Sequence, residues 1–293
     1  MLDCPYSQRI NDFKDWLYWS RYQALIVEYQ DENGEIKRKL VPKRIRFSKH
    51  YQKRLRRELM ALIPHIVQNY KVMFFLTLTV NPTWNLFEVF GKVSKQFAKV
   101  INVLKKRLKR KGISMDYIKV YEPTSKGIIH VHVVLFLTDY PRLHPSQKDR
   151  IWLIDKRELD EIWGLGHTWL GWEDKYGKWI WASLEKDGVR NTKKALFYIF
   201  KYISKAHSNL LFASLLWGQG RGGGIRSWTV SRGLSELMKV DRHEIPKTGV
   251  VVWFGYVWDI PDDLFPCEFD GCVVSSVKEA EELLKRWWDD DGG

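Results

Sequence analysis

Two histidines separated by one residue lie in an apolar segment of this chain. Residues 127–137 read GIIHVHVVLFL, a run that is typical of a β-strand buried on both faces. Side chains alternate along a strand, so His130 and His132 face the same way, about 7 Å apart along the chain. A buried imidazole costs free energy unless its nitrogens have partners. The pair therefore indicates part of a metal site, and two hydrogen-bonded core histidines are the alternative.

A third metal ligand is expected in the strand that precedes the histidines. The segment YIKVYE, residues 117–122, and the histidine strand form a predicted hairpin around PTSKG. If the turn consists of residues 123–127, Glu122 pairs with Ile128 and lies on the histidine face, diagonal to His130. A four-residue turn would direct Glu122 to the other face, where an ordinary salt bridge is expected. Such a site would hold Mn²⁺ or Mg²⁺, and imidazole ligands favour Mn²⁺ of the two.

A second group of reactive side chains lies in the segment FYIFKYISK, residues 197–205. At about 100° per residue, one helix face carries two phenols and two ammonium groups, those of Tyr198, Lys201, Tyr202 and Lys205. A tyrosine beside a metal-polarised phosphodiester can act as a nucleophile and form a phosphotyrosine ester. A nearby lysine would favour the phenolate or stabilise the phosphate charge. The alternative is two amphipathic tyrosines at a core edge beside solvated lysines.

The elements around these residues alternate between strands and helices. Residues 72–80 read as a strand, the apolar spacing over 90–108 predicts an amphipathic helix, and the hairpin follows. This order favours an α+β fold with a central antiparallel β-sheet flanked by helices. We expect three parts, namely a basic N-terminal extension packed on the core, a catalytic core and a C-terminal extension with an acidic tail, over residues 1–70, 71–210 and 211–293.

Basic side chains are in excess, and their distribution indicates a polyanionic partner. The net charge is +13, and residues 37–57 and 92–111 contain eleven and nine lysines or arginines and no acid. Solvated charged faces are the alternative interpretation, but two such stretches favour nucleic acid. We expect DNA contacts from Arg54, Arg57, Lys105, Lys106, Arg107, Lys109, Arg110, Arg221 and Arg226.

Other patterns exclude several classes of protein. The three cysteines include no CxxC pair, which argues against a disulfide framework or a structural zinc site. The chain has no GxxxxGK[ST] motif, so we expect no P-loop motor. The chain also has no apolar run of about 18 residues and no pattern of a signal peptide. We therefore expect a cytoplasmic protein without a membrane anchor.

Three motifs together resemble the HUH endonuclease superfamily, as found in rolling-circle replication initiator (Rep) proteins. FFLTLTV, YEPTSKGIIHVHVVLFL and YIFKYISK occur in the order of the family's three motifs, over residues 71–207. The His130-Val131-His132 triplet is similar to the family's His-hydrophobic-His pair. Tyr198 and Tyr202, followed by Lys205, resemble the two-tyrosine branch. The third histidine of plasmid-transfer relaxases is absent here, and the resemblance implies a ferredoxin- or RRM-like core.

The resemblance also implies a function. Members of this superfamily nick single-stranded origin DNA, leaving a 5′-phosphotyrosine and a free 3′-OH that primes synthesis. Here His130, His132 and Glu122 would hold the metal, and Tyr198 or Tyr202 would attack, in an order that the sequence leaves open. The second tyrosine would resolve the first link and rejoin the strands. Without a motor domain, a separate helicase and a polymerase of the host are the expected partners.

Two other functions remain open at the level of sequence. A two-tyrosine HUH transposase would carry the same motifs. A non-catalytic protein that binds single-stranded DNA or RNA through aromatic strands would need neither the metal nor the tyrosines.

Overall fold

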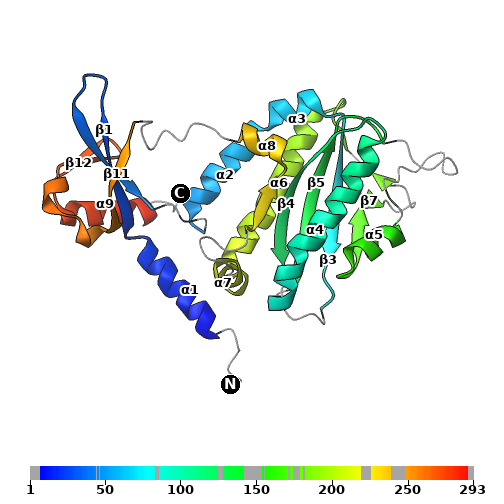
Figure 1. Ribbon diagram of the computed structural model, residues 1–293, viewed down its shortest axis with the longest axis horizontal. Coiled ribbons are helices and arrows are strands. Elements are labelled where there is room, and N and C mark those ends of the chain that lie inside the picture. Colours follow the sequence, from blue (N-terminus) through cyan, green and yellow to red (C-terminus); the bar gives the residue numbers. More distant parts are fainter. Residues whose placement is uncertain are drawn as a thin grey trace. The chain divides into compact units, whose positions relative to one another are not determined.

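The computed structural model divides the chain into two compact units, which are described separately (Figure 1). Met1–Leu55 and Lys239–Gly293 form one unit, the terminal unit, and Arg56–Met238 form the other, the central unit. The structure describes residues 7–43, 45, 47–82, 86–124, 128–141, 154, 156–170, 172–173, 179–180, 182–218, 226–238 and 248–289.

The central unit is built on a six-stranded antiparallel sheet. Its order is β10-β4-β5-β3-β6, and β9 also pairs with β3. A separate pair joins β7 (Trp172–Glu173) and β8 (Trp179–Ile180). The strands of the large sheet are β3 (Val72–Thr79), β4 (Met115–Pro123), β5 (Ile129–Leu137), β6 (Thr168–Leu170), β9 (Ala182–Ser183) and β10 (Trp228–Val230).

Helices cover both faces of this sheet. The helices of the unit are α3 (Ile63–Asn69), α4 (Leu86–Lys109), α5 (Lys156–Trp163), α6 (Gly188–Ser208), α7 (Leu210–Gly218) and α8 (Arg232–Leu237), and α2 (Lys49–Ala61) begins in the terminal unit. The α+β fold with an antiparallel sheet flanked by helices is therefore confirmed. None of the described helices has the length and apolar character that crossing a bilayer requires.

The two long helices pack on opposite faces of the sheet. On one face, the α4 residue Phe97 meets Tyr117 of β4 with ring centroids 5.4 Å apart. On the other face, the α6 residue Tyr198 meets Phe75 of β3 at 5.4 Å. Figure 1 shows α4 running along one side of the sheet. Because side chains alternate along β4, its odd-numbered residues face α4 and its even-numbered residues face α6.

The α4 face contains a buried cation. The side chain of Lys119 is on a residue only 5% exposed, and its Nζ donates to the Tyr121 hydroxyl at 2.9 Å. The same Nζ lies 4.4 Å from the ring centroid of Phe97 and 4.5 Å from that of Tyr121. The hydroxyl groups of Tyr121 and Ser94 are 3.0 Å apart. Ring faces and a hydroxyl therefore solvate this ammonium group inside the protein.

The terminal unit has its own sheet, which unites both ends of the chain. Its order is β11-β1-β2-β12-β13, in which β1 pairs with β2 and with β11, and α9 contributes to the core beneath it. Cys267 is buried, Cys272 is exposed, and both are free thiols. The elements are α1 (Ser7–Ser20), β1 (Gln23–Gln30), β2 (Ile36–Pro42), β11 (Val250–Tyr256), β12 (Cys267–Phe269), β13 (Cys272–Val274), α9 (Val277–Asp289) and two short 3-10 helices, Val257–Asp259 and Asp262–Leu264.

Candidate active site

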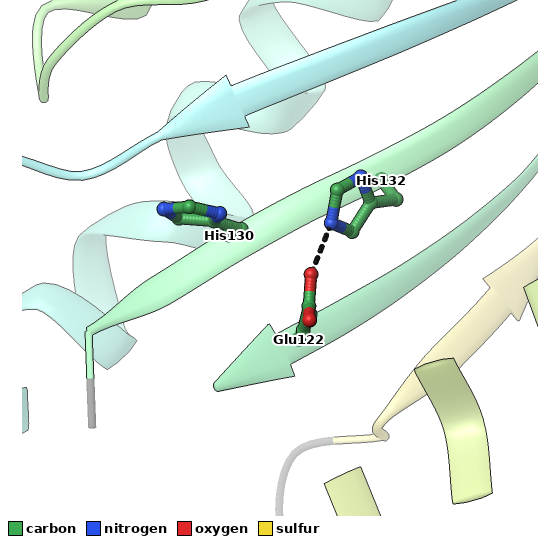
Figure 2. A group of neighbouring side chains, drawn as sticks. All are labelled: Glu122, His130 and His132. Atoms are coloured by element: carbon green, nitrogen blue, oxygen red, sulfur yellow. Dashed lines mark hydrogen bonds and ion pairs between the residues drawn. The ribbon is translucent and has the colours of Figure 1, made fainter. Parts of the chain in front are cut away.

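Glu122, His130 and His132 form a compact group on the α6 face of the sheet. One possible ligand atom from each lies within 4.8 Å of the others. Glu122 of β4 stands directly opposite His130 of β5, and Val120 stands opposite His132. His132 Nε2 lies 2.6 Å from Glu122 Oε2, the contact drawn in Figure 2. Two nitrogens and one carboxylate thus point to one place.

The register of the hairpin differs by one residue from the expected one. Pro123 pairs with Ile129, so the connection consists of residues 124–128 rather than 123–127. The backbone NH of Thr124 donates to the Ile128 carbonyl at 2.8 Å, which closes this connection. Five residues still separate the strands, so Glu122 keeps the histidine face. It lies directly opposite His130 instead of diagonal to it.

Burial prepares both imidazoles for a metal. Desolvation lowers the pKa of His130 and of His132 below the usual range, although the Glu122 carboxylate opposes the shift. Thr77 Oγ1 of β3 lies 3.2 Å from His132 Nδ1 and holds the ring from its other side. Neutral imidazoles are the form that binds a cation. The donor set therefore fits Mn²⁺ or Mg²⁺.

The third motif brings two tyrosines against this group. The Tyr202 ring stacks on the His132 ring, with centroids 4.2 Å apart and 17° between the planes. The Tyr198 ring meets Tyr202 edge-on at 4.6 Å and His132 at 5.9 Å. Burial and a hydrogen bond with Tyr202 raise the pKa of Tyr198. The metal group and both phenols thus occupy one site.

The span that contains this site matches a known family. Residues 73–207 match the model of a family of replication-associated proteins, described as replication-associated protein ORF2. The match begins in β3 and ends in α6, so it includes the metal group and both tyrosines. No curated protein and no solved structure matches the chain.

The two lysines of this replication-associated segment lie differently. Lys205 Nζ forms an ion pair with Glu122 Oε1, and this contact raises the Lys205 pKa. Its side chain is half exposed, whereas that of Glu122 is 11% exposed. Lys201 is exposed on α6, and none of the contacts found for the described residues joins it to Glu122. Lys205 therefore belongs to the metal group, and Lys201 faces solvent near it.

The basic residues expected to bind DNA do not gather around the metal group. Lys105, Lys106, Lys109 and Arg110 are exposed near the end of α4, the helix on the opposite face of the sheet. Arg107 forms an ion pair with Glu158 of α5. Arg57 and Arg226 are exposed, Arg54 is half buried with its guanidinium 5.4 Å from the Tyr51 ring centroid, and Arg221 lies outside the described residues.

Sequence reasoning missed the polar residues of β3 that complete the site. Thr77 stands opposite His132, and Thr79 stands opposite His130. Their alternation in FFLTLT was a usable signal, because threonines two apart share a strand face. The reading of this segment as a strand was confirmed, but its hydroxyl groups received no role.

Proposed function

We propose that this protein is a replication initiator that nicks single-stranded origin DNA through a metal-assisted tyrosine attack. One observation carries the proposal: the stacking of Tyr202 on His132, a member of the metal group. A nucleophile and a phosphate-polarising cation must meet at one phosphodiester, and this contact brings them together. The match to a replication-associated family favours a replication role over a transposase role.

The reaction needs one bond to form as another breaks. A bound Mn²⁺ or Mg²⁺ supplies a Lewis acid that polarises the scissile phosphate. Tyr202 Oη releases its proton and forms a bond to phosphorus, while the bond from phosphorus to the 3′-oxygen breaks and that oxygen takes up a proton. The ester bond to tyrosine keeps the energy of the phosphodiester, so a later 3′-OH reverses the step and joins strands.

The two tyrosines have different roles in this proposal. Tyr202 attacks first, since its ring lies on His132. The raised pKa of Tyr198 keeps its phenol protonated, and the hydrogen bond with Tyr202 that contributes to this shift would stabilise a Tyr202 phenolate. Tyr198 then attacks in the second round. The ammonium groups of Lys205 and Lys201 would stabilise charge on the phosphate.

The setting of this chemistry follows from what the chain lacks. The sequence has no P-loop motif, so a separate helicase would unwind the DNA, and a host polymerase would extend the 3′-OH in the cytoplasm. The exposed basic residues of α4 would contact phosphates outside the reaction centre, and their contribution would weaken as salt rises.

The test is a search for covalent protein–DNA adducts. The protein would be incubated with a random-sequence pool of single-stranded DNA and Mn²⁺, with and without EDTA, and analysed on a denaturing gel. We expect an adduct that EDTA abolishes and that Tyr198→Phe/Tyr202→Phe lacks. Salt-sensitive binding with no adduct on any sequence, including DNA of its own replicon, would support the non-catalytic alternative instead.

A further inference from the structure

One exposed tryptophan lies in the same cross-strand row as the metal group. Trp169 of β6 pairs with Thr77 of β3, which in turn pairs with His132 of β5. Directly opposed residues of antiparallel strands point to the same face. Thr77 Oγ1 lies 3.2 Å from His132 Nδ1, which places this row on the α6 face. Trp169 therefore points to the face on which the tyrosines stack.

The distance from Trp169 to the site suits a neighbouring nucleotide. Adjacent strands are about 4.8 Å apart, so the backbones of Trp169 and His132 are about 10 Å apart. A short stretch of extended single strand covers this distance. Lys205 and Glu122 lie on the β4 side of His132, whereas Trp169 lies on the β6 side. A strand that crosses the sheet over the metal group would reach Trp169 next.

The exposure of Trp169 also indicates a ligand. Its residue is 52% exposed, whereas Trp163, a few residues earlier, is 0% exposed and donates Nε1–H to the Thr79 carbonyl at 2.7 Å. Trp163 thus has a structural role that Trp169 lacks. A half-exposed indole offers a large rigid π-face, which stacks on any unpaired base.

A second residue next to Trp169 adds a polar contact on the same face. His167 follows the β6 register opposite Thr79, and its NH and carbonyl both bond the Thr79 hydroxyl, at 3.0 and 2.8 Å. Its carbonyl also accepts from the Thr79 backbone NH at 2.8 Å. These bonds fix the backbone while the imidazole stays exposed. An exposed imidazole can donate to a phosphate oxygen.

We propose that Trp169 stacks on a base that flanks the scissile phosphate, and that His167 contacts the adjoining backbone. The ligand is a nucleobase of single-stranded DNA, because a base in a duplex keeps its own stacking partners. This inference rests on the proposed nicking function for the identity of the strand, but stacking itself requires neither metal nor tyrosine.

The experiment pairs a protein change with a DNA change. Trp169→Ala would be compared with wild type on an oligonucleotide recovered from the adduct pool, and on versions with one abasic nucleotide at each position near the nick. Binding is measured by fluorescence anisotropy in EDTA, and adduct formation is measured in Mn²⁺. We expect Trp169→Ala to weaken binding roughly 5- to 100-fold, the range for loss of one stacked base.

The decisive result is non-additivity at one position. We expect one abasic position to weaken wild-type binding to a similar extent and to have no further effect in Trp169→Ala. Trp169→Phe should recover most of the binding, and His167→Ala should lower it less. Losses that multiply at every abasic position, or unchanged binding in Trp169→Ala, would overturn the inference.

Matched controls separate this inference from the proposed function. Trp19→Ala removes a tryptophan of similar exposure, 48%, from the terminal unit and should leave the abasic pattern unchanged. Thermal unfolding of each variant checks the fold. If no adduct forms on any DNA, the same anisotropy series is run by scanning abasic sites through a short oligonucleotide. The abasic pattern would then support stacking while nicking fails, and an adduct without that pattern would support nicking alone.

Discussion

The two faces of the central sheet both bury polar groups, yet they use them differently. On the α4 face, the Lys119 ammonium lies between the rings of Phe97 and Tyr121 and bonds a hydroxyl. On the α6 face, the buried groups are Glu122 and His132, whose lone pairs point to a shared place. The first face holds its own cation, and the second offers donors to an external one. Burial alone therefore does not mark a functional site, whereas convergent cation-binding atoms do.

The largest expected effect tests the α6 face directly. His132→Ala removes one nitrogen of the metal group, so we expect Mn²⁺ affinity to fall about 100-fold or more, with nicking lost alongside it. Isothermal titration with Mn²⁺ measures the affinity. His65→Ala, a change on α3, serves as the control and should bind Mn²⁺ as wild type does. Equal Mn²⁺ affinity in His132→Ala would assign the metal to another place.

A second variant tests the cation that touches this site. Lys205→Met removes the ammonium that engages Glu122 Oε1, which frees an oxygen and removes a positive charge near the metal. We expect Mn²⁺ affinity to rise about tenfold, as for the loss of one nearby like charge, while the rate of adduct formation falls. Lys194→Met, an exposed change on the same helix, should alter neither quantity. A fall in metal affinity in Lys205→Met would contradict this account of the ion pair.

The α4 face should respond in stability rather than in metal binding. Lys119→Met keeps the length of the side chain but removes the charge over Phe97 and the bond to the Tyr121 hydroxyl. We expect the free energy of unfolding to fall by about 1–2 kcal/mol, with Mn²⁺ affinity unchanged. Urea unfolding and titration of the same preparation measure both. Loss of metal affinity at full stability would break the distinction between the two faces.

The smallest expected effect is a shift in pH dependence. Only neutral imidazoles bind the metal, so affinity falls as pH drops through the pKa values of His130 and His132. Burial lowers both pKa values, so the fall should have its midpoint below pH 6.5, the usual value for histidine. Mn²⁺ titrations between pH 8 and 5 measure the midpoint. A midpoint above 6.5 would mean that the Glu122 carboxylate outweighs desolvation.

Local periodicity was enough to predict the elements that hold the site. The alternation of β5 and the helical spacing of α6 placed His130 with His132, and Tyr198 with Tyr202, on common faces. The face of Glu122 depended on the length of one turn, and a one-residue shift in register left it unchanged because the turn kept five residues. Stacking of Tyr202 on His132 depends on how α6 packs against the sheet, which no local pattern contains.

Long-range partners were beyond the reach of sequence reasoning. Composition predicted a basic helix, but the pairing of Arg107 with Glu158 and the position of α4 on the opposite face follow from tertiary packing. In the terminal unit, β1 pairs with β11, more than 200 residues later in the chain. The sequence analysis treated residues 1–70 and 211–293 as separate extensions, and its three-part division stays a prediction.

The most direct test of the central claim is to locate the DNA on the protein. The wild-type adduct formed in Mn²⁺ would be digested with nuclease and trypsin, and the modified peptide would be sequenced by mass spectrometry. The account predicts a nucleotide phosphate on Tyr202, with Tyr198 modified when the Tyr202→Phe variant is used. An adduct on any residue outside this pair, or one that forms equally well in EDTA, would contradict it.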